Sequence, residues 1–274
     1  MANLQIKSGF KNYWKNLRFN LSASDSPIFL FYYRHIYTPK KDGLPDFISQ
    51  YSLSKKDDFF VIQIGANDGI THDPIHKFIK RDRWKGVLLE PQPDVFRESL
   101  SKIYKNHPGL TPLCAAIGYE DGSQKLYKIG FSTMRWATGL ASFSEEKIKK
   151  LFEDGIVQKN CEKNGLEIPR DPDKQITSEE VQVISPETLL KKYAINKIDL
   201  LQVDAEGFDL EVIRMFDVPK NKPNAIIFEN ENLNPEDLEK CYELLRSENY
   251  NLKEFGRDTL AVKKELTQFE HFFQ

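Results

Sequence analysis

The chain has 274 residues, of which 40% are hydrophobic, and its 39 Lys and Arg residues nearly balance its 41 Asp and Glu residues. This composition fits one large globular domain or two small ones, and the charge balance gives no broad electrostatic reason to bind nucleic acid. The three cysteines form no CxxC pair, which argues against a zinc site or a disulfide framework. No apolar run approaches the ~18 residues of a spanning helix and no signal peptide is evident, so we expect a cytoplasmic protein.

The first 50 residues differ from the rest, and we expect them to form a helical extension of a domain that spans residues 51–274. Lys7, Lys11 and Lys15 recur every four residues, as on one side of a helix. The other side would carry apolar residues, namely Phe10, Tyr13, Trp14 and Leu17. Such a helix could contact an anionic membrane peripherally, or pack on the main domain or on a second subunit of a homo-oligomer; we favour packing. The stretch 27–33 is too apolar to be exposed, so we expect it to be buried against the sheet, a dimer mate or the acceptor pocket.

The segment Phe59–Gly69, FFVIQIGANDG, predicts a buried strand that runs into a turn bracketed by Gly65 and Gly69. Two glycines let the backbone turn sharply and leave N–H groups bare for a ligand. Asp73 as N-cap and Pro74 as first helical residue predict a helix after the loop. A strand, a Gly loop and a helix open many nucleoside-binding α/β domains, although a plain strand-to-helix turn would look similar.

A second buried strand, residues 86–89, ends in Glu90, where an acid can accept hydrogen bonds from both ribose hydroxyls. Pro91 follows in the turn. A third strand is expected over residues 111–117. The small residues Cys114, Ala115 and Ala116 in it could form a wall against an adenine ring, and tight core packing explains them equally well.

The loop does not match a dinucleotide site, because G-x-G-x-x-G is reduced to Gly65-x-x-x-Gly69 and no Lys or Arg stands there to hold a phosphate. Asp68 would repel a phosphate. An acidic loop instead suits a ligand with an ammonium and a sulfonium centre, as in S-adenosylmethionine.

Three segments together resemble the FkbM family of S-adenosylmethionine-dependent methyltransferases: VIQIGANDG, LLEP ending at Glu90, and residues 198–207, IDLLQVDAEG. The resemblance covers roughly residues 59–263. It implies a Rossmann-like three-layer α/β sandwich whose mostly parallel seven-stranded sheet ends in an antiparallel hairpin. Gln63 stands where many such enzymes have an acid, so Asp68 or Asn67 would help to hold the amino-acid end of the cofactor. Gln202 stands where the family usually has Lys.

A strand pair, residues 125–129 and 181–184, flanks an insert at about 130–180 that we interpret as a lid. Within it Ser144 can cap a helix, whereas residues 154–180 are polar, lack periodicity and predict a loop. Arg135 and Trp136, with Ser142 nearby, could hold a sugar or an acidic acceptor by charge and stacking, although a buried Trp in an ordinary loop is an alternative.

Acids gather where later strands end. Asp204 and Glu206 follow the strand 198–203, and Glu229 ends the strand 225–229, so with Glu90 they should meet at one rim of the sheet. They could form a Mg²⁺ site, for which Asp204 and Glu229 are our candidates, or supply a general base. Asp209 and Glu211 are interpreted as solvated acids at a helix N-terminus. Residues 251–255 and 259–263 predict a hairpin.

These patterns predict O-methyl transfer from S-adenosylmethionine to a hydroxyl of a sugar or another small molecule, with Glu206, Asp204 or His72 as the base. A nicotinamide-dependent oxidoreductase and a catalytically silent nucleoside-binding module are the alternatives. The predicted cofactor contacts are Gln63, Gly65, Ala66, Asn67, Asp68, Gly69, Glu90, Pro91, Cys114, Ala115, Ala116 and Asp204.

Overall fold

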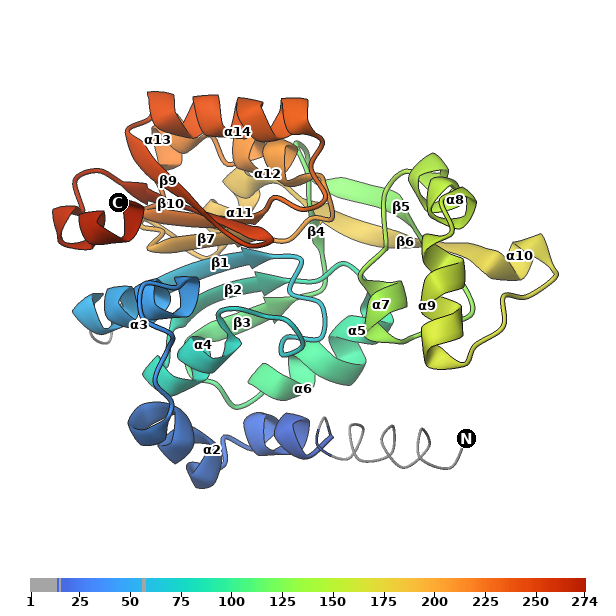
Figure 1. Ribbon diagram of the computed structural model, residues 1–274, viewed down its shortest axis with the longest axis horizontal. Coiled ribbons are helices and arrows are strands. Elements are labelled where there is room, and N and C mark those ends of the chain that lie inside the picture. Colours follow the sequence, from blue (N-terminus) through green and yellow to red (C-terminus); the bar gives the residue numbers. More distant parts are fainter. Residues whose placement is uncertain (1–13, 15, 56–57) are drawn as a thin grey trace.

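The computed structural model describes residue 14, residues 16–55 and residues 58–274. Its centre is a seven-stranded sheet with the order β3-β2-β1-β7-β8-β10-β9 (Figure 1). The strands are β1 Phe60–Ile64, β2 Lys85–Leu89, β3 Leu110–Leu113, β7 Leu200–Val203, β8 Ala225–Glu229, β9 Tyr250–Phe255 and β10 Asp258–Lys263. Every pairing is parallel except those of β10, which is antiparallel to both β8 and β9. The predicted fold, with its terminal hairpin, is confirmed.

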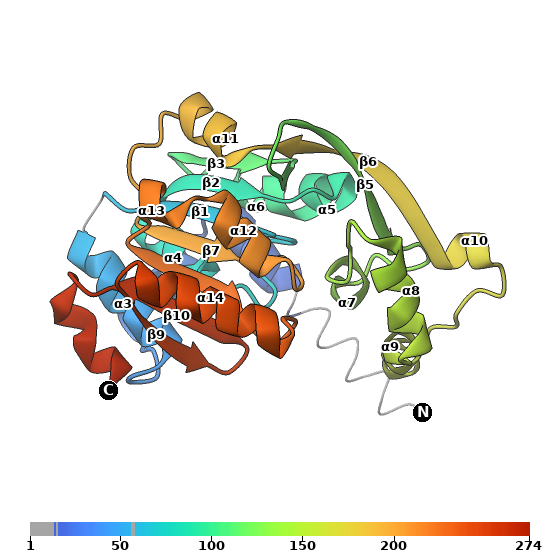
Figure 2. The same ribbon diagram turned by 90° about the horizontal axis from the view of Figure 1, so that it is seen from above.

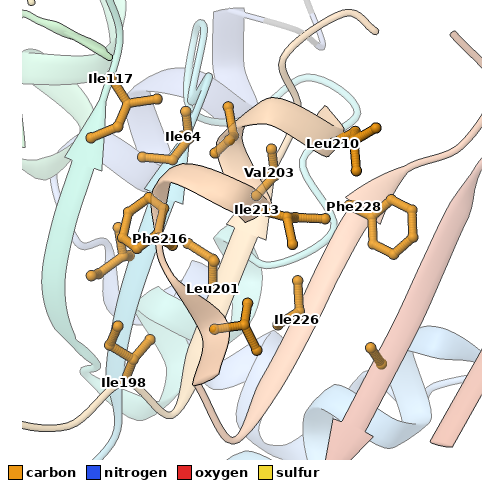
Figure 3. Close-up of a cluster of buried hydrophobic side chains, with 14 of the residues drawn as sticks. Ile64, Ile117, Ile198, Leu201, Val203, Leu210, Ile213, Phe216, Ile226 and Phe228 are labelled. Atoms are coloured by element: carbon orange, nitrogen blue, oxygen red, sulfur yellow. The ribbon is translucent and has the colours of Figure 1, made fainter. Parts of the chain in front are cut away.

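The strands are apolar on both faces because helices cover both sides of the sheet. One face packs against α11 Pro186–Lys192, α12 Asp209–Met215, α13 Val218–Asn221 and α14 Pro235–Ser247. Figure 3 shows this cluster. Ile64, Val203 and Phe228 come from three strands. They pack with Ile213 of α12 and with Phe216, which directly follows α12. The other face packs against α3 Leu44–Lys55, α4 His76–Asp82, α6 Ser101–Tyr104 and the 3₁₀ segment η3 Thr267–Phe273.

The N-terminal segment packs on the domain through α4. Residues 16–23 are helical, and α2 Pro27–Phe31 continues into the π-helix η1 Tyr32–Ile36. The boundary expected at residue 50 is wrong, because α3 crosses it and contributes four residues to the core. The expectation that residues 27–33 are buried is also wrong for Ile28 and Phe31, which are 74% and 57% exposed. Lys7, Lys11, Lys15, Phe10 and Tyr13 lie outside the described residues.

The third predicted strand is in fact two strands in different sheets. Ala115 N–H donates to the Leu113 carbonyl, and this tight turn takes the chain out of the main sheet after β3. β4 Ala116–Ile117 then pairs with β6 Ile176–Ile184, which also pairs with β5 Gly122–Ile129. This three-stranded sheet carries the insert away from the domain (Figure 2).

The insert is folded rather than a loop, so the prediction for residues 154–180 is wrong. It contains α7 Arg135–Thr138, α8 Glu145–Glu153, α9 Ile156–Asn164 and α10 Pro172–Gln175, followed by the first half of β6. Its apolar residues form a separate small core around Ile129, Ile148 and Val157. The helices therefore depend on contacts between segments that are distant in sequence.

The helix start predicted at Ser144 is confirmed, because its side chain accepts the capping N–H bond of α8. The side chains of Ser185 and Asn234 accept the corresponding bonds of α11 and α14. Asp73 instead acts just before α4. Its Oδ1 accepts from the N–H groups of Ile75 and His76, so the regular helix begins two residues later than predicted.

Candidate active site

A cavity of about 540 Å³ opens at the carboxyl ends of β1, β2 and β7. This is where an open α/β sheet binds its ligands. Predicted site residues that line it are Gly65, Asn67, Glu90, Pro91, Ala115, Ala116, Arg135, Ser142, Asp204 and Glu206. Predicted cofactor residues that do not line it are Gln63, Ala66, Asp68, Gly69 and Cys114.

The backbone N–H groups of the loop after β1 already donate hydrogen bonds within the protein. The N–H groups of Gly65 and Ala66 both donate to the Leu89 carbonyl, and Gly69 N–H donates to the Ala66 carbonyl. Asn67 N–H donates to Glu90, and Asp68 N–H donates to the Asn67 side chain. The expectation of bare N–H groups is therefore wrong. The loop offers no backbone donors to a phosphate, and this removes the main feature of a dinucleotide site.

The two glycines serve close packing. A Cβ at Gly65 would stand 1.9 Å from the carbonyl oxygen of Asp204, and its φ of +78° is costly for other residues. A Cβ at Gly69 would stand 2.8 Å from Leu100 Cδ1. Asp68 also shapes the loop, since its Oδ1 accepts from the N–H groups of Ile70 and Thr71.

Glu90 is buried at the end of β2, with only 2% of its surface exposed. Its Oε2 accepts from Asn67 N–H at 2.8 Å, and its Oε1 accepts from the backbone and side chain of Gln92 at 2.9 and 3.1 Å. Burial raises the pKa of Glu90 to about 7 despite these donors. A carboxylate has about four lone-pair sites, so one site, on Oε2, remains for a ligand hydroxyl.

Gln63 lies outside the cavity. Its Nε2 donates to Asp73 Oδ2 at 3.2 Å, while its buried Oε1 has no partner in the described part of the chain. Gln202, opposite it on β7, has a buried Oε1 in the same condition. Cys114 only approaches the Pro91 carbonyl, at 3.9 Å.

The acids after β7 and β8 meet as predicted at the rim. Asp204, Glu206 and Glu229 each place one carboxylate oxygen within 4.8 Å of the others. Asn232 Nδ2 bridges two of them, at 2.8 Å from Glu206 Oε2 and 2.7 Å from Glu229 Oε2. Arg257 binds the other oxygen of Glu229.

The pKa of Glu206 lies close to neutral pH. Burial and then the neighbouring Asp204 charge raise the pKa of Glu206 to about 7, against the lowering influence of Arg135, Lys147 and Arg257. Burial also raises the pKa of Asp204. Its buried Oδ1 has no partner among residues 16–55 and 58–274, and its Oδ2 lies 3.9 Å from Arg135. Asp204 lines the cavity, and a carboxylate in the wall of a cavity suits a cationic ligand.

Asp209 is completely buried, so its interpretation as a solvated acid is wrong. Its two oxygens accept from Gly207 N–H and Glu229 N–H, both at 3.2 Å. It thereby ties the loop after β7 to the end of β8. Glu211, on the same helix, pairs with Arg214 at 2.7 Å.

A second cavity of about 670 Å³ adjoins the first. The two cavities share three lining residues, namely Arg135, Gly139 and Glu206. His72 and Trp136 line only the second cavity, whereas Ser142 lines only the first. A Cβ on Gly139 would stand 2.1 Å from Arg135 Nη1 and 3.2 Å from Glu206 Oε1, so a larger residue here would displace these side chains.

Hydrogen bonds join the insert to residues that line the first cavity. Gln92 Nε2 donates to the Thr138 carbonyl at 2.9 Å, and Thr138 Oγ1 lies 3.4 Å from Asn67 Oδ1. Lys147 Nζ donates to the Glu206 carbonyl. Sequence reasoning missed Gln92, Thr138, Gly139, Lys147 and Asn232, since nothing in the local sequence shows that the insert folds back over the sheet.

In the sheet, the antiparallel strand β10 lies between β8 and β9. The cavity is lined by residues of the Gly loop and by acids at the strand ends. Together these features define a Rossmann-like methyltransferase. The FkbM methyltransferase domain family matches residues 63–252, and the chain belongs to this family. No curated protein matches the sequence significantly.

Among solved structures, the chain is similar to the methyltransferase FkbM from Methylobacillus flagellatus KT, with a TM-score of 0.44 and 10% identity over 80% of this chain. It spans only 50% of that protein. A Podospora anserina methyltransferase bound to S-adenosylhomocysteine has a TM-score of 0.38 and 10% identity, covering 86% of each chain. An O-methyltransferase from Bacillus cereus has a TM-score of 0.35 and 12% identity, covering 88% of this chain and 91% of the other. These similarities are too distant to transfer a substrate.

Proposed function

We propose that the protein transfers a methyl group from S-adenosylmethionine to a hydroxyl group of a sugar or another small molecule. The observation that carries this proposal is the wall of Arg135, Gly139 and Glu206 shared by two cavities. A transfer between two bound molecules needs two adjoining chambers and a reactive group at their junction.

The first cavity fits the cofactor. Glu90 has one acceptor site left for a ribose hydroxyl, and the carboxylate of Asp204, which lines the same cavity, would stabilise a cation there. The closed Gly loop lacks the donors that a pyrophosphate needs, so a nicotinamide dinucleotide fits less well. When bound, S-adenosylmethionine supplies an electrophilic methyl group on sulfur.

The second cavity fits a hydroxylated acceptor. Its lining includes the amide side chains Asn16, Asn160 and Asn164 and the cation Lys163, none of which lines the first cavity. Amide groups both donate and accept, as hydroxyl recognition requires. Arg135 lines both cavities, and its buried Nε has no partner among the residues that the structure describes.

Glu206 is our base. As the bond between the acceptor oxygen and the methyl carbon forms and the sulfur–carbon bond breaks, the hydroxyl proton passes to the Glu206 carboxylate. A carboxyl with its pKa at about 7 is half ionised at neutral pH and accepts a proton more readily than an ordinary glutamate. His72 is exposed and lines only the second cavity, so we rank it below Glu206.

A Mg²⁺ ion fits the acids poorly as they stand. Mg²⁺ demands near-octahedral oxygen coordination, yet both oxygens of Glu229 and one of Glu206 already accept from Arg257 or Asn232. Among the described residues, the two oxygens of Asp204 and Oε1 of Glu206 are the acid oxygens that accept no hydrogen bond. We propose a transfer that does not require a metal, so turnover should persist when EDTA is added.

Calorimetry and a turnover assay test the proposal. Saturable binding of S-adenosylmethionine without binding of NAD(H) is expected, followed by formation of S-adenosylhomocysteine with an acceptor panel of sugars and other small hydroxyl compounds. Binding of NAD(H) in preference would support an oxidoreductase. Cofactor binding without turnover on any acceptor would point to a silent nucleoside-binding module.

A further inference from the structure

The outward face of α2 and η1 is apolar and uncovered among the described residues. Ile28 is 74% exposed, Phe31 57%, Tyr32 45% and Ile36 59%. Positions 28, 31, 32 and 36 are three or four residues apart, so they form one stripe along the helix. Soluble proteins rarely leave such a stripe uncovered unless it binds something.

The stripe belongs to a segment that is anchored on the domain. Phe29, on the inward side, packs edge-on against the ring of His76 at 6.0 Å, and Tyr37 packs against Phe78 at 6.5 Å. Arg34 Nε donates to the Arg81 carbonyl at 3.2 Å. Figure 1 shows this segment along one side of the molecule, next to α4 and α6. The inward side is thus already occupied, and only the outward stripe is left for a partner.

The same part of the chain carries a strong positive charge that the overall balance hides. Residues 1–41 contain five Lys, two Arg and one Asp, a net charge of +6. Because the whole chain has a net charge of -2, residues 42–274 carry -8. Arg18, Arg34, Lys40 and Lys41 are exposed, and the single acid, Asp25, pairs with Lys80 at 2.7 Å.

We propose that this surface docks the enzyme on an anionic phospholipid membrane. The apolar stripe would enter the boundary between headgroups and acyl chains, and the flanking cations would contact the headgroups. A second copy of the chain is a poorer partner, because a two-fold interface would place the same positive segment against itself. No helix in the described part of the chain is long and apolar enough to cross a bilayer, so the contact would be peripheral.

Vesicle sedimentation with the full chain tests the proposal. We expect retention on phosphatidylcholine vesicles that contain phosphatidylglycerol, little retention on phosphatidylcholine alone, and release at high salt. Each headgroup contact of a cation is worth about fivefold in partitioning, so Lys40→Glu with Lys41→Glu should reduce retention more than tenfold.

The apolar stripe is tested by Phe31→Ser with Ile36→Ser, for which we expect a loss of about tenfold or more. Leu53→Ser is the matched control, because Leu53 is 63% exposed on α3 outside the stripe. S-adenosylmethionine binding, measured on each variant alongside thermal unfolding, confirms that the fold is intact. Three results would overturn the proposal. The first is equal retention on both kinds of vesicle, and the second is unchanged retention of the variant with Phe31→Ser and Ile36→Ser. The third is a dimer in light scattering that becomes monomeric in this variant.

Discussion

Glu90 provides the sharpest test of the cofactor site, because its protonation should control affinity. Protein donors occupy three of its four lone-pair sites. One charge-assisted hydrogen bond to a ribose hydroxyl therefore remains, worth about 1.5–3 kcal/mol. We expect Glu90→Ala to weaken S-adenosylmethionine binding roughly 10- to 100-fold.

The pH dependence follows from the raised pKa of Glu90, which is about 7. Only the ionised carboxylate leaves all its lone pairs available, so cofactor affinity should rise with pH through 7. We expect binding at pH 6 to be about tenfold weaker than at pH 8. In Glu90→Gln, which cannot ionise, affinity should be lower and nearly constant between these two pH values.

Isothermal titration calorimetry of the wild type, Glu90→Gln and Glu206→Gln across this pH range separates the two acids. Glu206 has a similar pKa of about 7 but lies at the junction with the second cavity. If Glu206→Gln removes the pH dependence and Glu90→Gln retains it, the assignment of Glu90 to the ribose is refuted. A loss far beyond 100-fold in Glu90→Ala would show that both ribose hydroxyls bind the carboxylate.

Three further substitutions probe the base, the shared wall and the fold. Glu206→Gln should lower kcat about 100-fold or more, and the wild-type rate should rise with pH through about 7; a variant that retains its rate and pH profile would exclude Glu206 as the base. Gly139→Ala, at a φ that alanine tolerates, should reduce turnover while cofactor affinity stays within about threefold, and an unchanged kcat would show that the wall is not the junction. Asp199→Ala should lower the free energy of unfolding by about 3 kcal/mol in urea titrations and leave cofactor affinity unchanged, whereas a large change in affinity would contradict its distance from the site.

The last of these substitutions shows what a motif alone can and cannot reveal. Asp199 belongs to the segment that indicated the family, yet it lies immediately before β7, at the end of the strand opposite the cavity. Its oxygens accept from Phe60 N–H and the Asn224 side chain and pair with Lys197 at 3.1 Å. It thereby links the N-terminal ends of the three neighbouring strands β1, β7 and β8. The sequence pattern identified the residue but could not distinguish this structural role from a catalytic one.

The sheet and its helix caps could be predicted because their signals are local. A run such as Phe59–Ile64, or a cap such as Ser185 before Pro186, depends on residues a few positions apart. The insert could not be predicted in this way. Val157 and Cys161 of α9 form a core with Ile129 and Ile148, and a polar segment with few apolar residues gives no periodic signal until those partners are known.

The acids at the rim could be placed together from topology, but their state could not. Parallel strands end at one edge, so Asp204 and Glu229 had to be near each other. Whether they bind a metal depends on Asn232 and Arg257, which reach them from a loop and from the turn of the terminal hairpin. Such contacts depend on side-chain geometry across the fold and leave no spacing rule in the sequence.

The family segment Asp204-Ala205-Glu206-Gly207 acquires a physical meaning from its backbone. Glu206 and Gly207 both have positive φ values, +51° and +86°, and a Cβ at Gly207 would stand 2.6 Å from the Asn232 carbonyl. A glutamate in this region costs about 1 kcal/mol or more, so the surroundings must hold it there. Lys147 of the insert binds its carbonyl, and Asn232 binds its side chain. The strained residue is therefore one of the points where the insert contacts the sheet, and any shift of α8 would act directly on the proposed base.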